Sequence, residues 1–252
     1  MELKLLSESV INRWTTKEVH DADFNGFCLS KKRIKTILDV GANLGQSIVS
    51  LRILFPDADI HSFEANPTLI GELNKLSNQL PGNIKIHPYG LGDKPGSFYL
   101  NIPYAGDEVF LEEASISEAY YELPWVKQKF IERGGLTKLE KVQCELKTGD
   151  DLNLAPDLIK VDVEGAESLV LAGLRNTIQK FKPVIMIENS DWDAVAKVMK
   201  SLNYVARQFD QSQNMLVPQK EPTTNTFYIY QAPSLIDSVR GLITGTTAKA
   251  SL

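Results

Sequence analysis

The chain has 252 residues, of which 43% are hydrophobic and 23% charged, as is ordinary for a globular protein with one sizeable core. Its 27 basic and 32 acidic residues leave a net charge of −5, which argues against a nucleic-acid partner because such proteins usually present a basic surface. No apolar run reaches the ~18 residues of a membrane span, and the N-terminus does not resemble a signal peptide. We therefore expect no membrane contact and a cytoplasmic location.

The pattern of elements begins with residues 1–35, for which we expect a helical cap. From residue 36, short β-rich runs alternate with helical periods, which is typical of a parallel sheet covered by helices. Strands are predicted, in chain order, at 36–40, 58–63, 84–89, 97–101, 156–165, 184–189, 204–209 and 226–231. Helices are predicted from the apolar stripes Leu44-Ile48-Leu51-Phe55, Leu69-Leu73-Leu76-Leu80 and Val170-Leu174-Ile178, and over about 191–202.

Two segments interrupt or follow this alternation. Residues 102–143 form a long insert rich in aromatic residues, and long inserts at a sheet edge tend to be lids or binding elements. Residues 233–252 are expected to form a C-terminal tail. The prediction is therefore one α/β domain over 36–232, with helices on both faces of its sheet.

A glycine turn follows the first predicted strand, in the sequence "DVGANLGQ". A dinucleotide-binding loop would need the pattern Gly-x-Gly-x-x-Gly, but Asn43 and Gln46 stand where the second and third glycines would be. The turn therefore disfavours a diphosphate ligand and a nicotinamide-dependent oxidoreductase. Glu64 ends the second strand, about 20 residues after Gly41, where an acid commonly binds ribose hydroxyls. A nucleoside with a sulfonium tail, S-adenosylmethionine, meets both conditions.

Several motifs occur together in order and spacing: "LDVGANLGQS", "SFEANP", "GLGD", "DLIKVDVEGAE" and "IMIEN". Over roughly residues 34 to 205 this combination resembles the FkbM family of S-adenosylmethionine-dependent methyltransferases. The resemblance implies the class I methyltransferase fold, Rossmann-like, with a seven-stranded, mostly parallel sheet and a reversed last strand. Asn189 stands where family members often have a histidine, so no role of that histidine can be transferred.

The resemblance also implies which residues bind the cofactor. Near its methionine part these are Asp39, Gly41, Asn43 and Gly45. Near its ribose they are Glu64 and Asn66, and near its adenine Leu91, Gly92 and Asp93.

Charged residues alternate with aliphatic ones at the end of the 156–165 strand. Lys160, Asp162 and Glu164 should share one face, and Glu188 ends the next strand and could face them. We expect Asp162 to act as a base or acceptor anchor, Lys160 to orient it or lower the pKa of the acceptor, and Glu188 to help bind the acceptor. Glu164 could instead start the following helix, where the dipole favours a carboxylate. A structural ion pair is the alternative for Lys160.

Metal and histidine chemistry are less well supported by the sequence. Two carboxylates, Asp162 and Glu188, do not make a case for a metal ion, and Cys28 and Cys144 lie too far apart for a zinc site. His20 lies in the N-terminal region that could cover the site and is a further candidate for the base.

The function implied is O-methylation of a hydroxyl on a sugar or natural product, so the expected partner is a small-molecule or glycan acceptor. N- or carboxyl-methylation of a small molecule and a non-catalytic cofactor-binding scaffold remain as alternatives. The sequence does not indicate the oligomeric state.

Overall fold

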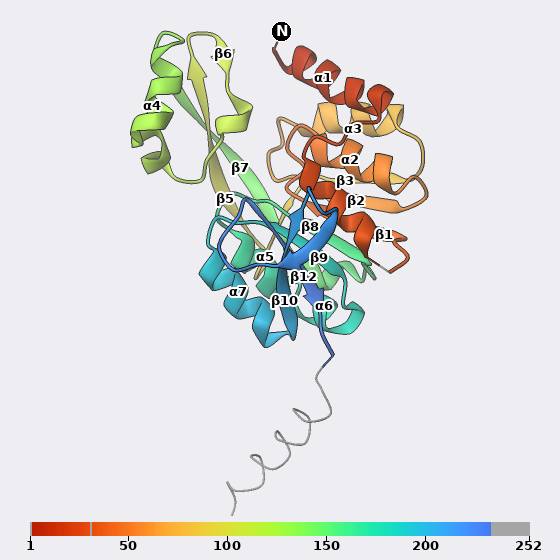
Figure 1. The fold of residues 1–252 in the computed structure, drawn as a ribbon. Helices are drawn as coiled ribbons and strands as arrows, with labels where there is room; N and C mark the ends of the chain where they lie inside the picture. Colours follow the sequence, from red (N-terminus) through yellow and green to blue (C-terminus); the bar gives the residue numbers. More distant parts are fainter. Residues whose placement is uncertain (1, 31, 233–252) are drawn as a thin grey trace, which may run out of the picture.

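The structure is a computed structural model that describes residues 2–30 and 32–232 (Figure 1). The predicted tail, 233–252, lies outside the described residues. Within them, no helix combines the length and the apolar character that crossing a membrane would require.

The main sheet has the strand order β11-β10-β12-β9-β8-β1-β2-β3. All pairs from β9 to β3 are parallel, whereas β12 runs antiparallel to both of its neighbours. The bounds are β1 Thr36–Val40, β2 Asp59–Phe63, β3 Ile84–His87, β8 Leu158–Val161, β9 Val184–Glu188, β10 Tyr204–Asp210, β11 Met215–Pro218 and β12 Asn225–Tyr230. The mostly parallel sheet with a reversed last strand is confirmed.

The sheet differs from the expected seven strands by one. The additional strand is β11, which pairs antiparallel with β10 at the outer edge. Its sequence, "MLVP", is too short to separate from a loop by periodicity, and only the pairing with β10 identifies it as a strand.

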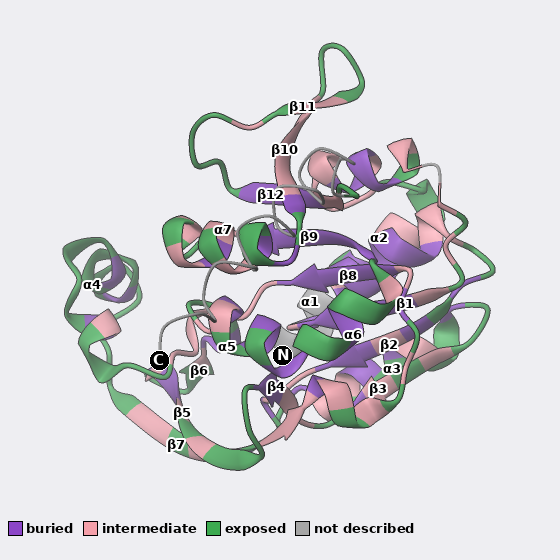
Figure 2. Cartoon of the chain, turned by 90° about the horizontal axis from the view of Figure 1, so that it is seen from below, coloured by how far each residue is buried: buried purple, intermediate pink, exposed green. Residues whose placement is uncertain are grey.

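Helices cover both faces of the sheet, as alternation along β1 makes clear. Leu38 and Val40 point to the face that packs against α5 (Glu167–Gly173), α6 (Arg175–Phe181) and α7 (Trp192–Ser201). Ile37 points to the opposite face, which packs against α2 (Gln46–Leu54) and the short 3-10 helix η1 (Ala22–Leu29). Further helices are α1 (Glu2–Thr16) and α3 (Ile70–Gln79), which contact each other and share a cluster with α2. In Figure 2 the central strands are buried.

The helix predicted from the stripe Leu69-Leu73-Leu76-Leu80 is α3, and in the turn before it the side-chain oxygen of Asn66 accepts a hydrogen bond from the backbone N–H of Thr68. The single helix expected over Val170–Ile178 is broken into α5 and α6 at Leu174. The apolar residues keep their helical spacing across this break, so the periodicity of the sequence does not reveal it.

The insert is a projecting arm built on a second sheet (Figure 1). Strand β5 (Gly96–Ala105) pairs antiparallel with β7 (Lys138–Thr148), and β4 (Gly90–Gly92) and β6 (Glu108–Val109) complete the order β4-β7-β5-β6. The arm also carries α4 (Pro124–Ile131) and the 3-10 helices η2 (Leu111–Glu113) and η3 (Glu118–Glu122); a fourth, η4 (Gly149–Leu152), follows β7. The short strand expected at 97–101 is thus part of the arm, which starts before residue 102.

Candidate active site

A cavity of about 330 Å³ opens at the carboxyl ends of β1, β2 and β8 and is closed on one side by the arm. Ligands of doubly wound sheets bind at this edge. Eight of the predicted site residues line it: Gly41, Asn43, Glu64, Asn66, Leu91, Gly92, Asp93 and Asp162. The structure therefore brings together motifs that lie more than a hundred residues apart in the chain.

Gly41 allows the backbone of the turn to touch the end of β8. It has a left-handed φ of 84°, and a Cβ atom added to it would lie 1.7 Å from the carbonyl oxygen of Asp162. No other residue could occupy this position without moving one of the two strands. The turn that lines the cavity and the strand end that carries Asp162 are thus held in contact.

Glu64 organises the wall of the cavity with both of its carboxylate oxygens. Oε2 accepts the backbone N–H of Asn43 at 2.8 Å, and Oε1 accepts the backbone N–H of Asn66 at 2.7 Å. Burial raises the pKa of Glu64, and these two backbone hydrogen bonds oppose the shift. Each oxygen keeps a further lone pair, so the carboxylate can still accept hydrogen bonds from ligand hydroxyls.

Asn66 provides an independent indication that the cavity holds a polar ligand. The residue is only 2% exposed and lines the cavity, yet its Nδ2 has no hydrogen-bond partner within the described part of the chain. A buried donor without a partner is costly, and a ligand acceptor atom would remove that cost. With Glu64 beside it, this donor and carboxylate fit the ribose and adenine parts of S-adenosylmethionine.

Asp39 and Gly45 do not line the cavity. Asp39 is fully buried behind the turn, where its Oδ2 accepts hydrogen bonds from the hydroxyls of Ser47 and Ser62, each at 3.0 Å. Gly45 precedes α2 with a φ of 93° and packs against Leu76. These two residues therefore support the turn from behind, whereas the sequence predicted that they would line the methionine side of the cofactor.

Lys160 also lies behind the turn. Its ammonium donates to the carbonyl oxygen of Gly41 at 2.7 Å and forms ion pairs with Asp162 at 3.2 Å and Asp39 at 3.7 Å. Burial would lower the pKa of Lys160, but the two carboxylates raise it above its ordinary value. The residue is therefore charged and connects the glycine turn to the acidic end of β8.

Replacing Lys160 with methionine should lower the free energy of unfolding by about 3–5 kcal/mol, because it leaves the buried carboxylate of Asp39 and the partly exposed carboxylate of Asp162 without their cation. The matched control is Lys141→Met, which breaks the exposed pair with Glu118 and should cost at most about 1 kcal/mol. Urea denaturation of both variants measures the difference. Equal losses would show that the buried ion pairs of Lys160 do not stabilise the fold.

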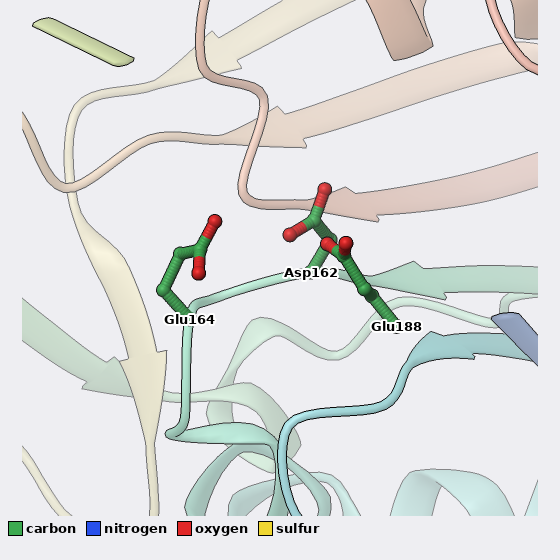
Figure 3. A group of neighbouring side chains, drawn as sticks. All are labelled: Asp162, Glu164 and Glu188. Atoms are coloured by element: carbon green, nitrogen blue, oxygen red, sulfur yellow. The ribbon is translucent and has the colours of Figure 1, made fainter. Parts of the chain in front are cut away.

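Three carboxylates converge beside the cavity (Figure 3). One carboxylate oxygen from each of Asp162, Glu164 and Glu188 lies within 4.8 Å of the other two. Asp162 and Glu164 line the cavity, and Asp162 and Glu188 are hydrogen-bonded to each other. Such a set of oxygens could hold a divalent cation, or it could share a proton.

The electrostatics of the site indicate where a shared proton resides. The hydrogen bond with Asp162 and burial raise the pKa of Glu188 to about 8. Burial acts against ionisation of Asp162, yet Lys160 and Glu188 together hold its pKa below the ordinary value. At neutral pH Glu188 therefore carries the proton and donates it to the ionised Asp162.

This shared proton should make stability depend on pH. Because the folded pKa of Glu188 lies above its unfolded value, the stability it contributes is fully present below about pH 4.5 and is lost as pH rises to about 8. In Glu188→Gln, an amide donor replaces the protonated acid, so this loss should disappear and the variant should be the more stable protein at pH 9. Denaturant titrations from pH 5 to 9 test this, with Glu108→Gln in β6 as control. Parallel curves for wild type and Glu188→Gln would contradict it.

The arm contributes cavity residues that the sequence did not identify. Phe98, Leu100 and Leu146 form an apolar wall from β5 and β7, Glu112 comes from η2, and Ile116 comes from the turn after η2. Glu164 also lines the cavity, although the sequence left open whether it starts the next helix. The aromatic composition of the insert was the one available signal, but the aromatic residues Phe110, Tyr121 and Phe130 pack into a separate core of the arm.

The fold and the cavity define a class I, Rossmann-like methyltransferase: the core strand order, the glycine turn after β1 and the acid after β2 are those of that class. The model of the methyltransferase FkbM domain matches residues 39–207. The chain belongs to the FkbM family of S-adenosylmethionine-dependent methyltransferases.

The individual relatives share little sequence identity with this chain. The chain is 27% identical over 151 residues to a protein of Haloferax volcanii named hexuronic acid methyltransferase AglP, covering 59% of this chain and 53% of that protein. It is 27% identical over 197 residues to methyltransferase sdnD of Sordaria araneosa, covering 69% of this chain and 74% of that protein. A crystal structure of methyltransferase FkbM from Methylobacillus flagellatus matches with a TM-score of 0.51 at 16% identity, covering 90% of this chain and 58% of that one. The chain thus spans only slightly more than half the length of the first and third.

Proposed function

We propose that this chain is an O-methyltransferase that methylates a hydroxyl group of a sugar or natural-product acceptor. The observation that carries the proposal is that one cavity is lined by both the predicted cofactor residues and the carboxylates of Asp162 and Glu164. The name of the Haloferax relative, a hexuronic acid methyltransferase, supports a sugar-like acceptor.

The proposed cofactor contacts follow from the free hydrogen-bonding capacity in the cavity. Glu64 would accept hydrogen bonds from the ribose hydroxyls, and Asn66 Nδ2 would donate a hydrogen bond to the nucleoside. Leu91, Gly92 and Asp93 would border the adenine. When bound, S-adenosylmethionine supplies the electrophilic methyl group.

The proposed acceptor chemistry divides two tasks between two carboxylates. Asp162 is held by Lys160 and Glu188 and has a lowered pKa, so it is a weak base but a well-oriented hydrogen-bond acceptor for a hydroxyl. Glu164 has a pKa raised by burial and by Asp162, and it makes no hydrogen bond or ion pair to any residue that the structure describes. We therefore assign Asp162 as the anchor of the acceptor and Glu164 as the base that receives the hydroxyl proton.

The function is tested in two stages. Calorimetry with S-adenosylhomocysteine and, in parallel, NADH should give micromolar binding of the first and none of the second. The protein is then incubated with methyl-labelled S-adenosylmethionine and a panel of hydroxyl acceptors, with and without a chelator and added Mg²⁺. Label in an ether-linked methyl supports the proposal, and loss of turnover with the chelator would assign the three carboxylates to a cation. Label on nitrogen or a carboxylate, or cofactor binding without turnover on any acceptor, would contradict it.

A further inference from the structure

The sheet face that carries the acidic residues is covered by the N-terminal segment. Lys160 and Glu188 point to the same face as Ile37 and Met186, because residues two apart on a strand share a face and β1, β8 and β9 pair in register. That face packs against α2 and η1. The connection between α1 and η1 packs on this same face through Val19, so it lies on the side of the sheet to which Lys160 and Glu188 point.

Two anchors hold this connecting segment across the carboxyl edge of the sheet. On one side, the backbone N–H of His20 donates to Ser50 Oγ in α2 at 2.9 Å. On the other, Asp21 and Asp23 accept hydrogen bonds from Asn225 Nδ2 at 2.8 and 3.2 Å. Asn225 is the register partner of Glu188. The segment that carries His20 is thus fixed at α2 on one side and, on the other, at the start of β12 beside Glu188.

The side chain of His20 is oriented by its neighbours. Nδ1 lies 2.8 Å from Ser50 Oγ, and the ring packs edge-on against Phe24 with centroids 4.6 Å apart. Nε2 makes no hydrogen bond to any residue in 2–30 or 32–232. Burial lowers the pKa of His20 to about 4, and the charged groups around it are Lys160, Asp21, Arg13 and Asp162. The imidazole is therefore neutral and offers one free ring nitrogen.

We propose that His20 is a further residue of the acceptor site, and that its Nε2 forms a hydrogen bond with the acceptor and orients the hydroxyl toward Asp162. The assignment rests on the proposed hydroxyl methylation. It gives the N-terminal segment a role in binding the acceptor, whereas the proposed cofactor residues of the cavity follow β1 and β2 or lie at β4.

Two amide variants separate this role from a purely structural one. The amide of Gln reaches the position of Nε2, whereas the amide of Asn reaches only the position of Nδ1 beside Ser50. If His20 binds the acceptor, kcat/KM for the acceptor should fall about tenfold or more in His20→Ala and His20→Asn, with a substantial part restored in His20→Gln. Affinity for S-adenosylhomocysteine should stay within about twofold in all three, and His61→Gln on β2 serves as the control. Greater activity in His20→Asn than in His20→Gln would overturn the proposal, because the contact with Ser50 would then be what matters. Unchanged activity in all variants would overturn it as well.

A second measurement needs no acceptor. In an NMR titration of the imidazole signals, Lys160→Met should raise the pKa of His20 and leave that of His87 unmoved, with calorimetry of S-adenosylhomocysteine verifying the fold. An insensitive His20 would remove it from the site. If the wild type binds the cofactor but methylates no hydroxyl, the proposed function fails, while this titration still decides whether His20 faces the charged group.

Discussion

Replacing Glu64 with glutamine is expected to weaken binding of S-adenosylhomocysteine by about 100-fold or more, because hydrogen bonds to a charged group contribute about 1.5–3 kcal/mol each. The carboxylate accepts backbone N–H groups from Asn43 and Asn66, and in our proposal it also accepts the ribose hydroxyls. Glutamine has only one accepting oxygen, whereas the carboxylate has two. Either a backbone N–H of the turn or a ribose hydroxyl therefore loses its acceptor. Calorimetric titration measures the change.

The control for this variant is Glu72→Gln, a surface change in α3 that breaks only the pair with Lys75. Circular dichroism should show the same fold in both proteins. If Glu64→Gln bound the ligand as tightly as the wild type, the ribose assignment would be withdrawn and the carboxylate would be left with its role in the turn.

The second large effect is expected for Asp162→Asn, which should reduce kcat by about 100-fold or more, since misplacing an acceptor by about 1 Å can cost that much. Affinity for the cofactor should be nearly unchanged, because the contacts of Glu64 and Asn66 are not altered. Turnover with the acceptor found in the screen and calorimetry with S-adenosylhomocysteine provide the two readouts. Full activity would show that another group orients the acceptor.

Glu164→Gln is the matched variant, since both carboxylates line the cavity. Loss of a general base typically costs about 10²–10⁴ in rate and removes the acid limb of the pH profile. We expect that limb to vanish in Glu164→Gln and to persist in Asp162→Asn. The opposite result would exchange the two roles, and N-methylation would make both variants nearly harmless.

Much of the fold was predictable because its signals are local. Strand-to-helix alternation, the glycine turn and the acid after β2 each occupy a few consecutive residues, and parallel strands bring their carboxyl ends to one edge. The positions of Gly41, Asn43, Glu64 and Asn66 at one cavity follow from that rule. The edge strand β11 was missed because four residues are too few to separate a strand from a loop by periodicity, and the break at Leu174 was missed because it leaves the apolar spacing unchanged.

The sequence by itself determined the sheet, the turn and the face on which Lys160, Asp162 and Glu188 lie. Only the tertiary structure decided what these side chains touch. Lys160 meets the carbonyl of Gly41, 119 residues away, because β1 and β8 pair in register. Asp162 and Glu188 share a proton because the ends of β8 and β9 hold these two partly buried acids close together. Contacts between distant segments depend on register and burial, and neither is encoded in local periodicity.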